Sequence, residues 1–304
     1  MKALLIYNPV SGKGNSAKRL DHIKKYFENE KWTLDIHASK SAEDIIEVSY
    51  NHANIYELYL VLGGDGTISN VVNGMMKSDI RPKLLVLPTG TANDFASILG
   101  IKKSKIDETL NLIKEDSYRK MDIYKANDKF FTYAAAIGKF TDVSYDIKRR
   151  TVKRFGHFAY VLKGLSDILT KAKFNVKITL DDNTTYETTS FLLFVLSARR
   201  VAGFNFKKFG DHIKLNDGKL EIVVFKRRHF LSWIKFTFVY LRKGKISKKD
   251  IRLSVSSANV NITPINYKWN LDGEYGFDGC AKLLVVNEAI EVYATPKAIK
   301  KYFI

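Results

Sequence analysis

Residues 58–67 read LYLVLGGDGT, and this stretch decides how the first part of the chain is expected to fold. Its first five residues are all apolar, which is typical of a strand buried on both faces of a parallel sheet. The glycines that follow break the strand and let the backbone approach a ligand closely. Thr67 can cap the helix predicted over Ile68–Met76, so that the positive end of this helix faces an anion. The stretch therefore predicts a strand, a phosphate-binding turn and a helix.

The same order of strand, turn and helix continues on both sides of this stretch. The apolar runs predicted as strands are Lys2–Tyr7, Thr33–His37, Leu58–Leu62 and Lys83–Leu87. Helical patterns are predicted over Ala17–Glu30, Ala42–His52, Ile68–Met76 and Ala92–Leu99. Apolar strands that alternate with helices indicate a parallel sheet covered on both faces.

The pattern changes after about Asp122. The later segments carry alternating or β-branched runs, typical of antiparallel strands, at Phe130–Ala136, Phe174–Leu180, Thr185–Leu196, Leu220–Phe225, Ile251–Ile262 and Lys282–Ala294. Helical patterns interrupt or end this part at Lys153–Lys171, His229–Arg242 and Pro296–Phe303. We expect an α/β domain over residues 1–122, rejoined by the tail at about 295–304, and an all-β domain over residues 123–294.

The chain is strongly basic, with 50 Lys and Arg against 32 Asp and Glu in 304 residues, a net charge of +18. Such a charge attracts polyanions, whether phosphate esters, nucleic acid or an anionic membrane surface, and does not choose among them. The single cysteine excludes an internal disulfide. No apolar stretch approaches the roughly eighteen residues that a transmembrane helix needs, so we do not expect an integral membrane protein.

Three glycine-bearing turns follow the first, third and fourth predicted strands. They read NPVSGKG at 8–14, GGDGT at 63–67 and LPTGTANDF at 87–95. In an open parallel sheet, ligands bind outside the carboxyl ends of the strands, so the three turns are expected to meet at one crevice. Successive backbone N–H groups in such turns can point at phosphate oxygens. Each turn alone could be an ordinary tight turn, and the spacing is not that of a Walker A loop; together they favour a nucleotide site.

In combination, GGDGT and PTGTANDFA resemble the catalytic domain of the soluble diacylglycerol kinase family, which includes bacterial lipid kinases and the sphingosine and ceramide kinases. The resemblance extends from Asn8 to the segment Asn270–Glu274. It implies an N-terminal α/β nucleotide-binding domain with a parallel sheet and a C-terminal antiparallel β-sandwich domain that binds lipid. It also implies ATP as phosphoryl donor, Mg²⁺ as cofactor and a membrane lipid as acceptor.

The resemblance assigns residues by matching motif. The implied ATP-binding residues are Asn8, Ser39, Gly63, Gly64, Asp65, Gly66, Thr67, Thr91 and Asn93. Glu274 matches the family's proposed general base, and Asp65 and Asp272 are grouped with it as catalytic candidates. Taken alone, Asp272 and Glu274 would be solvated acids of a hairpin turn.

The resemblance also implies two magnesium sites. Asp65, Asp94 and Asp122 match acids that form a water-linked network near the catalytic Mg²⁺. The segment 214–220 is similar to a structural Mg²⁺ loop, in which Asp217 supplies the carboxylate and Lys214 and Lys219 supply backbone carbonyls. One departure follows the glycine motif, where this chain has Ser69-Asn70 in place of the family's usual Asn-Glu, so the role of that carboxylate is in doubt.

These residue types suit phosphoryl transfer. The reaction depends on positioning and on neutralising charge, with Mg²⁺ bridging the phosphates. Mg²⁺ prefers one or two carboxylates together with waters and phosphate oxygens. A carboxylate such as that of Glu274 can accept the proton of the attacking hydroxyl.

Basic clusters gather in the second domain, at 148–150, 153–154, 199–200, 207–208, 226–228 and 242–249. Between the last two lies the aromatic-rich helical stretch Phe230–Leu241. Amphipathic elements flanked by Lys and Arg bind anionic interfaces. We therefore expect a cytoplasmic protein that associates peripherally with the inner face of an anionic membrane, although the aromatic side chains could equally face a core.

Other functions compete with a diacylglycerol kinase. NAD kinases also use a Gly-Gly-Asp-Gly loop on a similar core. Within the lipid kinases the acceptor could be phosphatidylglycerol, undecaprenol, a sphingoid base or ceramide. A basic nucleic-acid-binding protein is the non-enzymatic alternative, but no recognition module is present, so nucleic acid is not the expected partner. The sequence allows a homodimer without specifying one.

Overall fold

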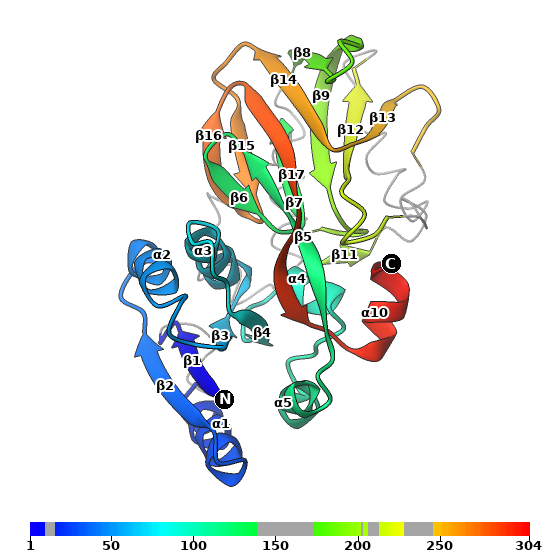
Figure 1. The fold of residues 1–304 in the computed structure, drawn as a ribbon. Coiled ribbons are helices and arrows are strands. Elements are labelled where there is room, and N and C mark those ends of the chain that lie inside the picture. Colours follow the sequence, from blue (N-terminus) through cyan, green and yellow to red (C-terminus); the bar gives the residue numbers. More distant parts are fainter. Residues whose placement is uncertain (10–15, 139–172, 202, 206–212, 228–245) are drawn as a thin grey trace. The chain divides into compact units, whose positions relative to one another are not determined.

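The computed structural model describes residues 1–9, 16–138, 173–201, 203–205, 213–227 and 246–304. The chain forms two compact units (Figure 1). Unit 1 comprises residues 1–123 and 287–304, and unit 2 comprises residues 124–286. The two predicted helices at Lys153–Lys171 and His229–Arg242 lie outside the described residues.

The sheet of unit 1 has the strand order β2–β1–β3–β4–β17, and neighbouring strands run parallel. Its strands are β1 (Lys2–Tyr7), β2 (Thr33–Ala38), β3 (Leu58–Gly63), β4 (Lys83–Pro88) and the end of β17 (Ala281–Tyr293). All six residues of β3 are buried, as its continuous apolar sequence predicts. The order reverses between β1 and β3, which makes the carboxyl ends of these strands a topological switch point, where open α/β sheets bind ligands.

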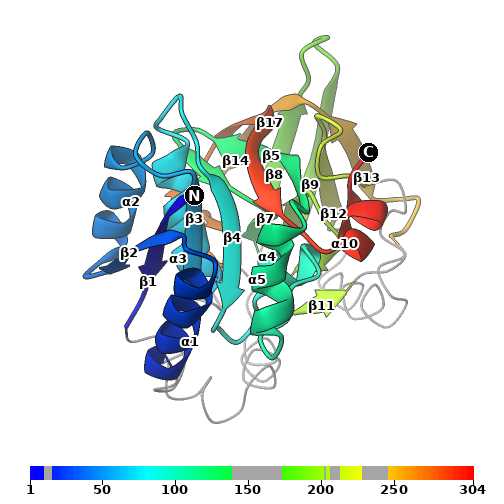
Figure 2. The same cartoon turned by 60° about the horizontal axis from the view of Figure 1, so that its bottom comes forward.

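Helices cover both faces of this sheet (Figures 1 and 2). They are α1 (Ser16–Asn29), α2 (Ala42–Asn51), α3 (Asp65–Met75), α4 (Asp94–Ile98), α5 (Ile106–Lys114) and α10 (Pro296–Tyr302). On one face α1 lies beside α5, and the Tyr26 hydroxyl donates to Asn111 Oδ1 over 3.1 Å. On the other face α2 and α3 pack closely. Gly74 of α3 lies so near α2 that an added Cβ would collide with the Ile46 carbonyl.

The predicted strands and helices of unit 1 are confirmed, with ends that shift by up to three residues. The main shift is in α3, which begins at Asp65 and not at Ile68. Gly64 is therefore the N-cap, and the prediction that Thr67 caps this helix is wrong. Since glycine offers no side-chain oxygen, no side chain caps α3, and the N–H groups of its first turn are not satisfied by a side-chain cap.

The tail of the chain belongs to unit 1. The predicted terminal helix is confirmed as α10, and Thr295 caps it by accepting a hydrogen bond from the Ala298 N–H over 3.3 Å. The Thr295 N–H donates to the Leu99 carbonyl over 3.0 Å. These contacts hold the tail against the end of α4.

Unit 2 is built from antiparallel strands, as its alternating sequence predicts. They are β5 (Tyr118–Ala126, which begins in unit 1), β6 (Lys129–Phe131), β7 (Ala134–Gly138), β8 (Phe174–Thr179), β9 (Thr185–Leu196), β10 (Arg200–Val201), β11 (Phe204–Asn205), β12 (Leu220–Lys226), β13 (Ile251–Val255), β14 (Ser257–Thr263), β15 (Lys268–Leu271), β16 (Glu274–Asp278) and the start of β17. The run predicted at Ile251–Ile262 is two strands, β13 and β14, that separate at Ser256.

The strands of unit 2 form a sandwich around one apolar core. The strand β9 pairs with β8 along its first half and with β7 and β12 along its second half. An irregularity at Phe191, where Phe225 pairs with Leu192 and Lys226 with Ser190, separates the two halves. Side chains from both layers meet in the core, with Trp269 and Tyr124 among the largest. The predicted fold class, α/β followed by an antiparallel β-sandwich, is confirmed.

Candidate active site

The carboxyl ends of β1, β3 and β4 lie side by side in unit 1. Tyr7 pairs with Leu62, and Gly63 pairs with Pro88. The turns that follow these strands therefore leave the same edge of the sheet, next to the switch point. Of the first turn, residues 10–14 lie outside the described part of the chain.

The second and third turns touch each other through their backbones. A Cβ at Gly90 would lie 2.9 Å from the Cα of Gly64 and 2.8 Å from Asn93 Oδ1, which is closer than real Cβ atoms approach. The Thr89 N–H donates to the Gly63 carbonyl over 2.8 Å. Only glycine fits at position 90, and the two turns form one continuous backbone surface beside the N-terminus of α3.

Asp65 links this surface to α4. It is the first residue of α3, and its Oδ1 accepts a hydrogen bond from the Phe95 N–H over 3.1 Å. Asn93 precedes α4 with a left-handed backbone (φ 48°), and its amide donates to the Gly90 carbonyl over 2.9 Å. The predicted residues 63–67, Thr91 and Asn93 are thus contributed by two adjoining turns.

The predicted acidic residues of unit 1 differ in exposure. Asp94 and Asp122 are fully buried, whereas Asp65 is partly exposed. Asp122 lies on β5, and its Oδ1 accepts the Glu288 N–H over 2.7 Å, which ties β5 to β17. Among the described residues, no three His, Cys, Asp or Glu side chains are grouped so that they could hold a metal ion directly. The water-linked network of Asp65, Asp94 and Asp122 therefore stays a prediction.

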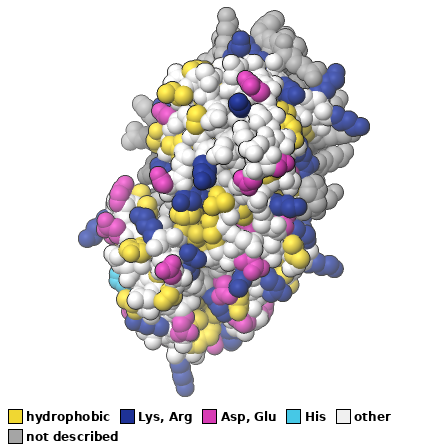
Figure 3. All heavy atoms as spheres, turned by 45° about the horizontal axis from the view of Figure 1, so that its top comes forward, with side chains coloured by type: hydrophobic (Ala, Val, Ile, Leu, Met, Phe, Trp, Pro, Cys, Tyr) yellow, Lys and Arg dark blue, Asp and Glu magenta, His cyan; other side chains and the backbone are white. Residues whose placement is uncertain are grey.

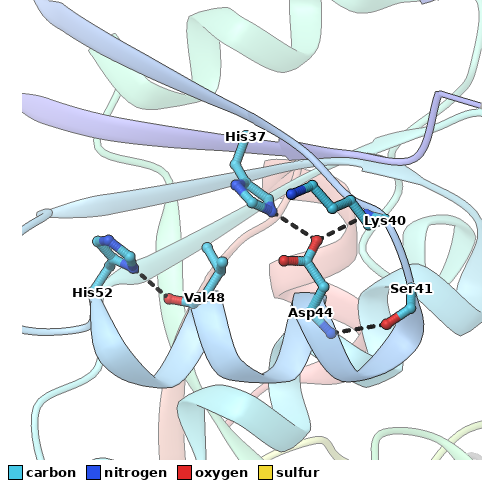
Figure 4. Close-up of polar contacts among 6 residues, drawn as sticks. All are labelled: His37, Lys40, Ser41, Asp44, Val48 and His52. Carbon is cyan, nitrogen blue, oxygen red and sulfur yellow. Dashed lines mark hydrogen bonds and ion pairs between the residues drawn. The ribbon is translucent and has the colours of Figure 1, made fainter.

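Ser39 lies at the end of β2, where its N–H donates to the Tyr7 carbonyl over 2.9 Å. Asp44 fixes the turn that follows (Figure 4). Its carboxylate accepts from the Lys40 N–H over 2.8 Å and pairs with His37 Nε2 at 2.9 Å, while its N–H is capped by Ser41 Oγ. Burial acts to raise the pKa of Asp44, but the hydrogen bonds from Lys40 and His37 outweigh it and the pKa is lowered.

The predicted structural magnesium loop is a tight turn in unit 2. Asp217 Oδ1 accepts the Lys219 N–H over 3.0 Å, and Gly218 has a φ of 69°. Burial raises the pKa of Asp217, although the backbone N–H groups of Lys219 and Lys214 act to lower it. Asp217 offers a half-buried carboxylate, which is a ligand that suits Mg²⁺. The backbone carbonyls of Lys214 and Lys219 as further ligands stay a prediction.

The Asp272-Gly273 turn of unit 2 is unusually well fixed. Leu271 pairs with Glu274, so the hairpin between β15 and β16 has a two-residue loop. Both loop residues have positive φ, 50° for Asp272 and 97° for Gly273, as a type I′ turn requires. The sequence of this turn, Asp-Gly, is one of the pairs that favour this geometry.

Asp272 is a buried anchor and not the solvated acid that a turn would suggest. Its carboxylate accepts from the Thr132 N–H (2.6 Å), the Thr132 hydroxyl (2.9 Å), the Tyr133 N–H (3.0 Å) and the Ala134 N–H (3.0 Å). Burial raises the pKa of Asp272 to about 6, against the effect of these donors. Glu274, two residues later at the start of β16, is exposed. The structure therefore gives Asp272 the role of holding the turn that carries Glu274.

Residues 2–126 match the sequence profile of the diacylglycerol kinase catalytic domain. A diacylglycerol kinase of Staphylococcus carnosus (strain TM300) is 32% identical over 302 residues, with 98% of this chain and 96% of that protein covered. The chain belongs to the diacylglycerol kinase family. A crystal structure of a diacylglycerol kinase from Bacillus anthracis str. Sterne is similar to this family member with a TM-score of 0.79 at 25% identity, covering 97% of this chain and 98% of the other.

As a member of the diacylglycerol kinase family, the chain is a lipid kinase with ATP as its phosphoryl donor. The resemblance found in the sequence is thereby confirmed. Yeast NADH kinase complexed with NADH has a TM-score of 0.52 at 11% identity, covering 99% of this chain and 86% of the other. At that identity the likeness shows a shared fold alone.

Sequence reasoning missed three residues that hold the turns at this edge of the sheet. Asp44 holds the turn after Ser39, while Arg19 and Lys103 bind backbone carbonyls at the end of β4. A side chain that binds a distant carbonyl leaves no motif in the sequence, because every residue has a carbonyl.

Proposed function

We propose that this kinase transfers the γ-phosphoryl group of ATP to the hydroxyl of diacylglycerol and so forms phosphatidic acid. The main observation in favour of ATP binding is that the backbones of the second and third turns touch each other in unit 1. There Gly64 is the N-cap of α3, so no capping side chain stands between the positive end of this helix and an anion. Gly90 lies against Gly64 without a side chain between them.

In this proposal Asn8, Ser39, residues 63–67, Thr91 and Asn93 bind ATP. Asp65 stands at the positive end of α3, beside the N–H groups that would bind the phosphates. When Mg²⁺ is bound it neutralises charge on the phosphates, and Asp65 is the carboxylate that would hold it. Asp94 and Asp122 would act through water. A second Mg²⁺ at Asp217, Lys214 and Lys219 would stabilise unit 2.

Glu274 is the proposed general base. The oxygen of the lipid hydroxyl bonds to the γ-phosphorus as the bond to the β–γ bridging oxygen breaks and ADP leaves. The hydroxyl proton passes to the Glu274 carboxylate. An exposed carboxylate on a rigid two-residue turn suits this task, because the turn fixes the position of Glu274 in unit 2 while water and substrate can reach it.

We propose that unit 1 is the ATP-binding domain and that unit 2 binds lipid at an anionic, cytoplasmic membrane surface. In the described part of the chain no helix is both long and apolar enough to cross a bilayer. Figure 3 shows Lys and Arg side chains spread over the drawn face among Asp and Glu. Several basic clusters that motivate membrane binding lie at residues 148–154, 207–208 and 242–245, outside the described residues, and a homodimer also stays a prediction.

The proposal is tested by an acceptor panel with radiolabelled ATP and Mg²⁺. Diacylglycerol, phosphatidylglycerol, undecaprenol, sphingosine and ceramide are each offered in mixed micelles, and NAD is offered in solution. We expect label in phosphatidic acid above all other products. Label mainly in another lipid would show that this lipid, and not diacylglycerol, is the acceptor. Label only in NAD would contradict the assignment as a lipid kinase. Salt-sensitive DNA binding without any phosphoryl transfer would favour the nucleic-acid alternative.

A further inference from the structure

Two cationic side chains converge on the end of β4, where the third turn begins. Arg19 reaches across from α1 and donates to the Pro88 carbonyl over 3.0 Å and to the Lys103 carbonyl over 2.8 Å. The Lys103 amino group donates to the Thr89 carbonyl over 2.7 Å. These bonds join α1, the end of β4 and the segment after α4 into one network.

This network fixes two successive peptide groups. The peptide between Pro88 and Thr89 is held at both ends, since Arg19 binds its carbonyl and its N–H donates to the Gly63 carbonyl. The next peptide is held by Lys103 through the Thr89 carbonyl. In a trans peptide the carbonyl and the N–H point in opposite directions. The bond from Lys103 therefore turns the Gly90 N–H away from Lys103 and sets its direction.

In the part of the chain that the structure describes, no carboxylate pairs with the Arg19 guanidinium. Within the described residues Arg19 forms no ion pair, and both of its hydrogen-bond acceptors are neutral carbonyls. Its guanidinium is partly buried, and burial lowers its pKa, but guanidinium remains protonated in proteins. A positive charge that is partly shielded from water acts over a longer distance than one on the open surface.

We infer that Arg19 and Lys103 form a cationic brace, defined by these two side chains, that positions the Gly90 backbone for the nucleotide triphosphate. The inference rests on the proposed function, because it assumes that the second and third turns bind ATP. Both are positioning residues: they hold carbonyls on one side of the turn so that N–H groups face the other. The charge of Arg19, which no carboxylate among the described residues pairs with, adds attraction for the polyanion at the same edge.

The test compares two brace variants with two matched controls. Arg19→Gln and Lys103→Gln each remove one charge from the brace. Lys24→Gln, on the exposed face of α1, and Lys102→Gln, next to Lys103, remove the same charge from side chains that are exposed. KM for ATP, KM for diacylglycerol and kcat are measured for each protein, with circular dichroism to check the fold.

We expect KM for ATP to rise at least about tenfold in each brace variant, the effect of losing one charge-assisted hydrogen bond. KM for diacylglycerol should stay unchanged, and the control variants should keep the wild-type KM for ATP. Arg19→Lys retains the charge but cannot span both carbonyls, so it should fall between Arg19→Gln and wild type. If Arg19→Gln does not fold, Arg19→Lys and Lys103→Gln decide the question.

Equal KM values for ATP in brace and control variants would contradict the positioning role of Arg19 and Lys103. The assignment as a kinase would not be affected. An equal rise in both KM values would also contradict the positioning role, because a loosened fold and not a positioned turn would then explain the effect. If the wild-type protein binds no ATP in calorimetry, the proposed function fails, and the brace fails with it.

Discussion

Replacing Asp272 by asparagine would remove one oxygen from the buried anchor of the Asp272-Gly273 turn and change little else. Asparagine tolerates the left-handed backbone that Asp272 adopts at φ 50°. The side chain keeps its size, so no cavity forms. The variant therefore isolates the hydrogen bonds to the carboxylate from the conformation of the turn.

The expected loss in the free energy of unfolding depends on which carboxylate oxygen of Asp272 is replaced by the NH₂ group of asparagine. Oδ1 accepts the N–H groups of Tyr133 and Ala134, and Oδ2 accepts the N–H and the hydroxyl of Thr132. With the new NH₂ at the Oδ2 position, the Thr132 hydroxyl can turn and accept, which leaves one buried N–H without a partner. With the NH₂ at Oδ1, two N–H groups lose their partner. The first orientation costs less, and one unsatisfied buried donor costs about 1–3 kcal/mol.

Urea unfolding at pH 7.5 measures this cost, since the wild-type carboxyl, with a pKa of about 6, is then ionised. Asp278→Asn is the matched control, because Asp278 is exposed on the same hairpin and its carboxylate accepts a hydrogen bond from the Tyr275 hydroxyl over 3.1 Å. We expect Asp272→Asn to lower the free energy of unfolding by about 1–3 kcal/mol. It should also lower kcat strongly and leave the affinity for ATP unchanged. Stability and kcat equal to those of Asp278→Asn would refute the anchoring role.

Three further changes test other parts of the account. Glu274→Gln should lower kcat by at least about a hundredfold, the usual contribution of a general base, and leave ATP binding measured by calorimetry intact; near-normal turnover would remove Glu274 from that role. Addition of Mg²⁺ should raise the melting temperature of wild type more than that of Asp217→Asn, and an equal rise would argue against the second site. Because the folded-state pKa of Asp44 lies below its unfolded value, its bonds stabilise the fold above about pH 4 and are lost as the pH falls through the folded-state pKa. Asp44→Asn should flatten this part of the acid unfolding curve, and an unchanged slope would contradict the assignment.

Local patterns in the sequence predicted the layers of the fold well. The unbroken apolar run before Gly63 identified a doubly covered strand, and alternation after Asp122 identified the antiparallel part. The start of α3 was predicted three residues late, because glycines read as loop although Gly64 is the N-cap. The helix at Ile106–Lys114 was not predicted at all.

The meeting of the second and third turns could be predicted, because the backbone itself forms the contact. The turns at 63–67 and 88–95 adjoin because parallel strands in register end at one edge. Contacts between a side chain and a distant carbonyl could not be predicted, and the bond from Arg19 to Pro88 spans 69 positions. The burial of Asp272 could not be predicted for the same reason, because its first hydrogen-bond partner, Thr132, lies 140 residues earlier in the chain.

The central claim is that the backbone of the second and third turns binds the triphosphate of ATP. A crystal structure with a non-hydrolysable ATP analogue and Mg²⁺ tests it most directly. The account predicts phosphate oxygens within hydrogen-bond distance of the N–H groups at the start of α3 and of Gly90. A triphosphate bound elsewhere on the protein, with these N–H groups facing only solvent, would contradict it.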